Sequence, residues 1–176
     1  MQQENTQEKE QLIEMLTIHF QNSHHLSPLG AKMWAVLIMD KNEDGLTFEY
    51  LVERLNASKS TISTNLSELL KKEIIFFETR EGDRKKYFKA APFSQRFTRI
   101  LKNMAFEKQL VEKMIDYKNK NATQCAMEQC AIENLKAFKT HLIEMQKLTQ
   151  KIVADLQTIE EKNILKLKEK SYHYEQ

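Results

Sequence analysis

Glycine, proline and cysteine are scarce in this 176-residue chain, which contains 3 Gly, 2 Pro and 2 Cys. Few residues are therefore available for tight phosphate-binding loops or for the many turns of a β-sandwich or barrel. Long hydrophobic runs are also missing, because the longest, Trp34 to Met39 and Ile74 to Phe77, fall far short of the roughly 20 residues of a transmembrane helix. These absences exclude a membrane protein and favour a mostly helical, soluble one.

Secretion has no support either. The first residues, Met1 to Asn5, are polar and acidic and lack the basic start and apolar stretch of a signal peptide. Cys125 and Cys130 are five residues apart in a predicted helix, where their side chains point about 140° apart around the axis and are poorly placed for a disulfide. A reducing cytoplasm is the predicted location.

Charge, in contrast, is abundant and unevenly distributed. Residues 1–55 carry 4 basic and 9 acidic side chains, residues 56–93 carry 8 and 5, and residues 94–176 carry 15 and 11. Five basic residues lie between Arg80 and Lys89 against two acidic ones. Such a density suits a polyanionic partner, although an isolated cluster of this kind is often only solvated surface.

Apolar spacing predicts four helices before residue 73. They are expected at Glu8–Phe20, at Leu29–Met39, after Thr47, and from Ser58 to about Lys72. Residues 42–45 form a turn after the second helix, and Asn56 and Ala57 separate the last two. Thr47 and Ser58 are suitable N-caps, because their hydroxyls can accept hydrogen bonds from the first helical amides. Two short helices are thus expected to meet across a tight turn.

A two-stranded hairpin follows these helices. Ile74–Glu78 is rich in β-branched and aromatic residues, Gly82 supplies the turn, and Lys85–Ala90 forms the returning strand. Pro92 closes the hairpin because it cannot donate to a ladder, and Ser94 is the expected N-cap of a long helix.

Everything downstream is predicted to be helical. No Gly or Pro occurs from Phe97 to Leu167, and from Leu135 to Ile159 apolar residues recur at steps of three and four, close to a heptad seam. The polar stretch Lys118–Thr123 is the expected bend between two long helices. A heptad seam requires a partner helix.

This order of elements predicts a mainly α fold with a small β-hairpin wing, a winged helix-turn-helix plus a long helical dimerisation region. In such folds the second of the two short helices enters the major groove, and the wing lies along the DNA backbone or a narrow minor groove. Asn65 could in principle pair with an adenine edge. The candidate DNA-binding residues are Ser58, Lys59, Ser60, Thr61, Ser63, Thr64, Asn65, Arg80, Arg84, Lys85 and Lys86.

Three stretches within residues 30–93 carry a family resemblance: LTFEYL (46–51), LNASKSTIS (55–63) and GDRKKYF (82–88). Together they resemble the GbsR branch of the MarR-type bacterial transcriptional regulators. The resemblance implies a homodimer built from N- and C-terminal helices, with one winged domain on each half of a near-palindromic operator, and repression relieved by a small effector. It also implies that Arg84 is the wing arginine and that Asp83 helps to shape the wing tip.

The domain organisation follows from both lines of reasoning. Residues 1–28 are expected to be an N-terminal helix contributing to dimerisation, residues 29–93 a DNA-binding domain, and residues 94–176 long dimerisation helices. The predicted partners are a double-stranded operator, a second copy and a possible small effector of unknown binding site, with no cofactor and no membrane. A rival hypothesis is a protein-interaction adaptor that binds no DNA, in which the winged domain is a docking surface and the C-terminal helices form a heteromeric coiled coil.

Other chemistry has weaker support. No Gly-rich phosphate loop, zinc-protease motif or nucleophile elbow occurs, so an enzyme is not expected. His19, His24 and His25 match no metal-ligand spacing and are interpreted as surface residues at a helix end. For the two cysteines, apolar packing is favoured over a redox role, and Trp34 is expected in the core rather than in an aromatic cage. Core filling rather than an effector pocket is also the expected role of Met104, Met114, Met127 and Met145.

Overall fold

The computed structural model describes residues 2–40, 45–121 and 125–174, and within these ranges the side chains of residues 6–166. The chain divides into two compact units, Met1–Ala91 and Pro92–Gln176. Three residues of the predicted turn, residues 42–44, lie outside the described residues.

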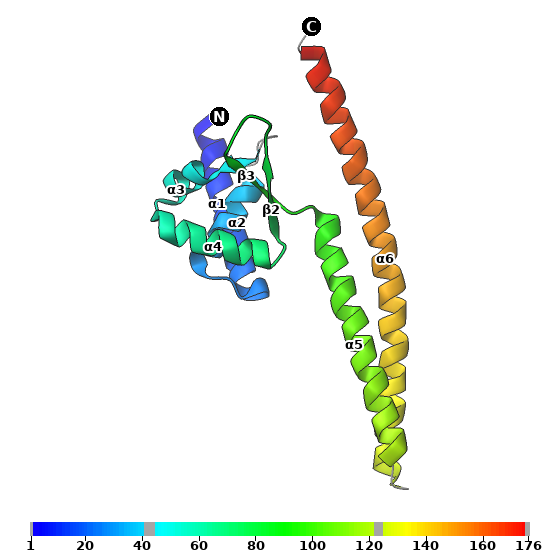
Figure 1. The fold of residues 1–176 in the computed structure, drawn as a ribbon. Coiled ribbons are helices and arrows are strands. Elements are labelled where there is room, and N and C mark those ends of the chain that lie inside the picture. Colours follow the sequence, from blue (N-terminus) through cyan, green and yellow to red (C-terminus); the bar gives the residue numbers. More distant parts are fainter. Residues whose placement is uncertain (1, 41–44, 122–124, 175–176) are drawn as a thin grey trace. The chain divides into compact units, whose positions relative to one another are not determined.

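The first unit is a winged helix (Figure 1), which confirms the predicted fold class. Its elements in chain order are α1 (Gln2–His24), α2 (Pro28–Met39), β1 (Leu46–Thr47), α3 (Phe48–Leu55), α4 (Lys59–Lys71), β2 (Ile75–Thr79) and β3 (Lys86–Ala90). The first helix is longer than predicted, because the polar residues before Glu8 include no helix breaker. It ends before His25, whose φ of 50° lies in the left-handed region.

Trp34 is the centre of the core of this unit and is 1% exposed. The ring of Phe20, from α1, stacks on Trp34 with centroids 3.8 Å apart, and His24 meets the indole edge-on at 4.9 Å. The prediction that Trp34 is a core residue is therefore confirmed. Since α1 supplies part of this core, it belongs to the winged unit, whatever further role its outer face has.

The sheet has three strands rather than the two predicted, in the order β1–β3–β2. Leu46 pairs with Phe88 on one side of β3, and Phe77 pairs with Phe88 on the other. The prediction missed β1 because two residues are too short to show an alternating pattern.

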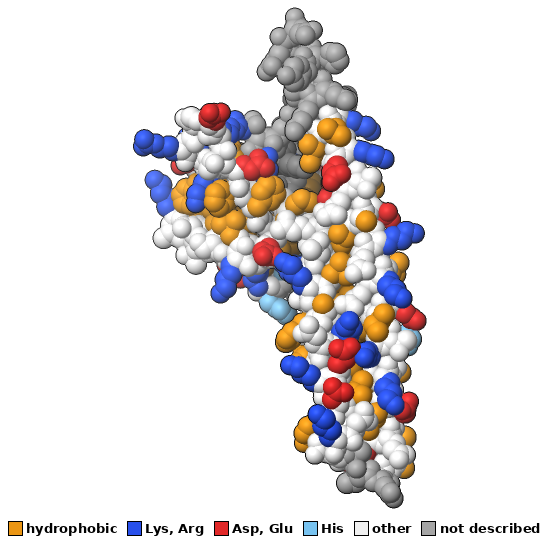
Figure 2. All heavy atoms as spheres, turned by 45° about the vertical axis from the view of Figure 1, so that its right-hand side comes forward, with side chains coloured by type: hydrophobic (Ala, Val, Ile, Leu, Met, Phe, Trp, Pro, Cys, Tyr) orange, Lys and Arg blue, Asp and Glu red, His pale blue; other side chains and the backbone are white. Residues whose placement is uncertain are grey.

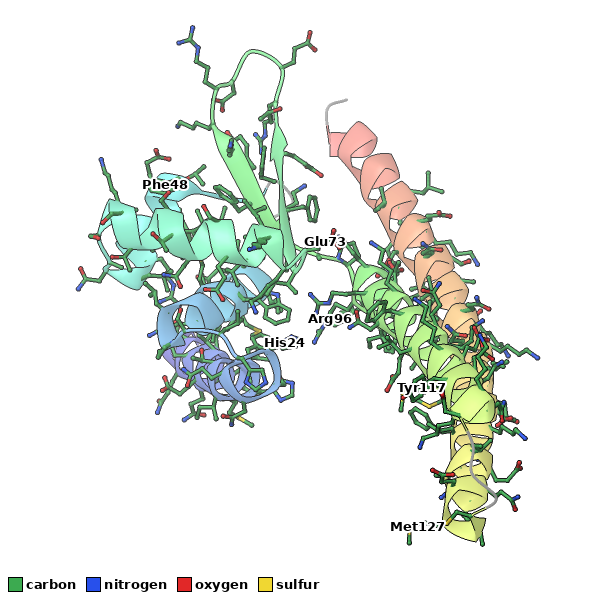
Figure 3. All side chains as sticks on the ribbon, turned by 60° about the horizontal axis from the view of Figure 1, so that its bottom comes forward. His24, Phe48, Glu73, Arg96, Tyr117 and Met127 are labelled. Atoms are coloured by element: carbon green, nitrogen blue, oxygen red, sulfur yellow. The ribbon has the colours of Figure 1, made fainter. Side chains whose placement is uncertain are left out.

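The second unit is a helical hairpin of α5 (Phe93–Asn121) and α6 (Ala126–Tyr174), which run antiparallel (Figure 1). Arg96 and Tyr117 mark the two ends of α5 in Figure 3. The predicted bend begins later than expected, because residues 118–121 are still helical, and Ala122 and Thr123 lie outside the described residues.

The prediction that Ser94 caps α5 is wrong. The helix already includes Phe93, and Ser94 is buried. Its backbone N–H donates to Oε1 of Glu160 on α6 at 3.1 Å, and its hydroxyl donates to Oε2 of the same carboxylate. A carboxylate from the facing helix thus satisfies an amide of the first turn, in place of a local cap.

The heptad seam is real, but the sequence pattern combined two stripes of α6. Residues that face α5 recur at steps of three and four from Ile132 to Glu160, and all of them are buried or half-buried. Leu142 is 3% exposed in this seam, whereas Phe138 and Met145 are 44% and 50% exposed. Several apolar residues predicted for one seam therefore form a second, uncovered stripe.

Candidate nucleic-acid interface

The two short helices are capped as predicted. The Thr47 hydroxyl accepts a hydrogen bond from the Tyr50 amide at 3.2 Å, and the Ser58 hydroxyl accepts one from the Thr61 amide at 3.2 Å. Between them, Asn56 ends α3 in the left-handed conformation, with a φ of 47°. These local signals fix the tight turn that positions α4 after α3.

One face of α4 is buried and the opposite face is exposed. Ile62, Leu66 and Leu69 are at most 4% exposed and pack into the core. The exposed residues at the N-terminal end are Lys59, Ser60, Thr61, Ser63 and Thr64. The end of the helix that carries their hydroxyls also presents free backbone N–H groups, a combination that suits phosphate oxygens and base edges.

Asn65 does not belong to this exposed set, and its predicted role as a reader of adenine is corrected. The residue is 8% exposed. Its amide nitrogen donates to the Thr61 carbonyl at 2.8 Å, and its oxygen accepts from the Ser27 hydroxyl at 2.6 Å. Both ends of the amide are engaged inside the protein, so it cannot reach a base.

The wing presents cations held on aromatic rings. The guanidinium of Arg80 lies 3.9 Å from the Tyr87 ring centroid, and the ammonium of Lys86 lies 4.3 Å from that of Phe77. Arg84 and Lys85, at the tip, are also exposed. The structure therefore brings all four predicted wing residues to the surface of one hairpin.

Asp83 shapes the wing tip, as the family resemblance implies. Its Oδ1 accepts from the Lys85 amide at 2.9 Å, and its Oδ2 accepts from the Tyr87 hydroxyl at 2.6 Å. The hydrogen bond from Tyr87 is the main cause that lowers the pKa of Asp83 below its ordinary value of 3.8. The tip is thus organised before any partner binds.

Removing that hydroxyl should show in the titration of Asp83. In Tyr87→Phe we expect the pKa of Asp83 to rise toward 3.8, measured by NMR of the carboxyl carbon. Because the folded pKa is depressed, the stabilisation is complete above the unfolded pKa and is lost as the pH falls through the folded one. The matched variant Tyr50→Phe should leave the pKa of Asp83 unchanged; an equal effect of both variants would refute the assignment.

A charged cluster, not predicted from the sequence, joins α1, the end of α2 and α3. Asp40, at the end of α2, accepts from Tyr50 Oη at 2.9 Å and Arg54 Nε at 2.8 Å, and its other oxygen lies 2.6 Å from Lys9 Nζ. Arg54 also contacts Glu10. Burial raises the pKa of Asp40, but the hydrogen bonds from Lys9, Arg54 and Tyr50 outweigh it, so the net pKa is lowered. No local motif signals a cluster assembled from three helices.

A cavity of about 330 Å³ lies beside this cluster, between the start of α3 with β1 on one side and the distal part of the wing on the other. Asp40, Tyr50, Arg80 and Tyr87 supply its polar lining, and Gly45, Leu46 and Thr47 complete it. Its volume is at the lower end of the range for small-molecule sites.

Several other expectations are corrected. Cys125 and Cys130 are both exposed, so neither has the expected packing role. Met114, Met127 and Met145 are 48–79% exposed and do not fill a core within the described residues.

Among the described residues, no helix combines the length and hydrophobicity required to cross a bilayer.

Comparison with known proteins bears on the fold. No protein-family model matches the sequence, and no curated protein matches it significantly. A solved structure described as the crystal structure of a transcriptional regulator is similar, with a TM-score of 0.67 over 86% of this chain and 99% of the other. The two sequences are 20% identical over that match. At this identity the likeness establishes a shared fold.

Proposed function

We propose that this protein is a homodimeric, sequence-specific DNA-binding transcriptional regulator, a cytoplasmic repressor of the GbsR-like branch of the MarR family that responds to a small effector. The observation that carries the proposal is that one winged unit exposes both a hydroxyl-rich helix N-terminus and a cationic wing. The similar structure, itself described as a transcriptional regulator, supports the same role. The proposed activity is binding, without catalysis.

In the proposed complex, α4 enters the major groove. Ser58, Lys59, Ser60, Thr61, Ser63 and Thr64 then face base edges and phosphates, because Ile62 and Leu66 fix the opposite side of the helix in the core. Arg80, Arg84, Lys85 and Lys86 contact the flanking backbone. The exposure of both surfaces favours DNA over the adaptor hypothesis, which expected them to be covered by neighbouring helices.

The second copy is proposed to bind the helical hairpin. Two contacts, Ser94 with Glu160 and Glu112 with Lys139, set the register of α5 against α6. In this register, each helix has one row of residues, spaced seven apart and each directly preceding every second seam residue, and the two rows lie on the same side of the hairpin. We name this row the apolar flank; it comprises Phe93, Ile100, Glu107, Met114 and Asn121 on α5, and Ala131, Phe138, Met145, Ile152 and Ile159 on α6.

The apolar flank differs from the other side of the same hairpin. The opposite row, the polar flank, comprises Thr98, Ala105, Glu112 and Asn119 on α5, and Gln129, Lys136, Ile143, Gln150 and Gln157 on α6. Phe93 is 60% exposed and Ile159 is 54% exposed, and hydrophobic side chains reach the surface along the length of the hairpin (Figure 2). A one-sided apolar row of this length suits a matching hairpin, and two hairpins would close a four-helix bundle.

The effector is proposed to bind the cavity beside Asp40. Arg80 and Tyr87 line this cavity and also belong to the wing. A molecule bound there would contact a residue proposed to hold the DNA backbone, which gives a direct route from effector to operator.

Arg84→Ala tests the wing. Arg84 is exposed at the hairpin tip, and loss of one phosphate contact per subunit, two per bound dimer, should weaken binding on all duplexes and lower the slope of log K against log [salt] by about two. Fluorescence anisotropy at several salt concentrations measures both. Lys71→Ala, an exposed cation at the far end of α4, is the matched control and should leave the slope unchanged. Equal slopes for Arg84→Ala and the wild type would remove the wing from the interface.

Selection of bound sequences from a random duplex pool tests the whole proposal. We expect an inverted repeat with half-site centres about 10–10.5 base pairs apart, one turn of the duplex. A pool that is not enriched after repeated rounds would overturn the proposal and favour the adaptor.

A further inference from the structure

Helices α2 and α4 meet at a small polar contact. Ser27 is the N-cap of α2, and its hydroxyl oxygen accepts the Gly30 amide at 3.0 Å while its proton is donated to the side-chain oxygen of Asn65 at 2.6 Å. The Asn65 nitrogen is bonded to the Thr61 carbonyl of its own helix. One chain of hydrogen bonds therefore runs from the first turn of α2 to the exposed end of α4.

The contact depends on a glycine. A Cβ placed on Gly30 would lie 2.9 Å from the Asn65 oxygen and 3.0 Å from the Ser27 oxygen. The first distance is shorter than real Cβ contacts and the second is at the tight limit, so a side chain at position 30 would displace the Asn65 amide from its present place. Glycine at this position therefore accommodates the close approach of Asn65 to the first turn of α2. Gly30 is one of only 3 glycines in the chain.

Apolar packing alone leaves the setting of α4 loosely defined. Ile62, Leu66 and Leu69 bury one face of the helix, but burial is non-directional and tolerates small rotations about the axis and small slides along it. The Ser27–Asn65 hydrogen bond tolerates them less, because it is directional and partly buried: Ser27 lies at the surface, but Asn65 is only 8% exposed. Single buried polar residues set helix register elsewhere for the same reason.

We propose that Asn65 is a positioning residue for sequence recognition: the Ser27–Asn65 hydrogen bond, made possible by Gly30, sets the rotation of α4 and so selects which side chains reach the bases. The inference rests on the proposed DNA binding. Thr64 directly precedes Asn65, and the carbonyl of Thr61 accepts a hydrogen bond from the side-chain nitrogen of Asn65. A rotation of the helix about its axis would therefore displace these exposed residues directly. Asn65 thus contributes to specificity without touching DNA.

Four variants separate positioning from general stability. Asn65→Leu keeps the volume but removes the acceptor, and Gly30→Ala places a methyl group where it displaces the Asn65 amide. Ser27→Thr keeps both the hydroxyl and the N-cap, so it should preserve the contact. Ser67→Ala, which removes an exposed hydroxyl bonded within α4 to Ser63, is the matched control. The whole 176-residue chain is used throughout, and circular dichroism at the assay temperature shows that each variant is folded.

The measurement is the ratio of affinities for the selected duplex and for a mixed-sequence duplex. In Asn65→Leu and Gly30→Ala we expect this ratio to fall about tenfold, with mixed-sequence affinity changed less than about twofold, because the cations are untouched. Ser27→Thr and Ser67→Ala should retain the wild-type ratio. An unchanged ratio in folded Asn65→Leu, or an equal loss on both duplexes, would overturn the inference.

The controls distinguish this inference from the proposed function. A wild-type protein that prefers no duplex overturns the proposed function itself. If the wild-type protein prefers the selected duplex and the Asn65→Leu and Gly30→Ala variants prefer it equally, only the positioning role is overturned. Should Asn65→Leu fail to fold, Ser27→Ala supplies the same test from the donor side, and retention of the wild-type ratio there would contradict the inference.

Discussion

Met145→Glu combined with Ile152→Glu is expected to convert the proposed dimer into monomers and to lower affinity for the selected duplex by at least about a hundredfold. Both residues lie on the apolar flank of α6, seven residues apart. Burying two carboxylates without partners in the proposed four-helix bundle would cost more than the interface can supply. A monomer also loses the second half-site, and linked sites can raise affinity by about 10²–10⁴ over one.

Gln150→Glu combined with Gln157→Glu is the matched control. These two positions are also seven residues apart and add the same charge, but they lie on the polar flank. Analytical ultracentrifugation should give a dimer for this control and a monomer for the first pair, and both should retain the helical content of the wild type. Dimers in both cases would place the subunit interface elsewhere and remove the apolar flank from the proposal.

Phe20→Ala is expected to destabilise the winged unit by about 3–5 kcal/mol, the usual cost of removing a buried aromatic ring. Phe20 is 2% exposed and stacks on Trp34. Since Trp34 is the only tryptophan of the chain, its fluorescence during urea denaturation reports the unfolding of this unit.

Phe106→Ala provides the comparison for this stability effect. Phe106 is 63% exposed on α5, so the same substitution there should change the free energy of unfolding by less than about 0.5 kcal/mol. If Phe20→Ala were equally mild, α1 would not be part of the winged core, and the arrangement of α1 on α2 would be wrong.

Local chemistry was predictable from the sequence. The N-cap hydrogen bonds of Thr47 and Ser58 join residues only three positions apart, so both can be predicted from the local sequence. The wing follows for the same reason, because Gly82 and its flanking strands form a local hairpin. The elements that carry the candidate surface, α4 and the wing, are therefore predictable from local sequence.

Long-range partners were not predictable. Asn65 resembles its exposed neighbours in sequence, and only Ser27, 38 residues away, removes it from the surface. Ser94 resembles an N-cap until Glu160, 66 residues away, takes that role. In both cases a local propensity is overridden by a polar group that the fold brings close.

The heptad pattern failed for a different physical reason. Apolar residues on α6 follow two rows: one packs on α5, and the other remains exposed. Because each residue of the exposed row directly precedes a residue of the packed row, a pattern of apolar spacing along the sequence does not separate the two. Leu142 and Met145 belong to different rows although they are three residues apart. The distinction requires the position of the partner helix.

Duplex affinity as a function of salt tests the central claim most directly. Wild-type protein, titrated into a labelled mixed-sequence duplex between 50 and 200 mM salt (about the range over which phosphate contacts are resolved), should bind measurably at the lower end. Its affinity should then fall steeply, with a log–log slope that reflects several phosphate contacts from the two wings and two α4 helices. Absence of binding at the lowest salt concentration, or an affinity that does not depend on salt, would contradict the account.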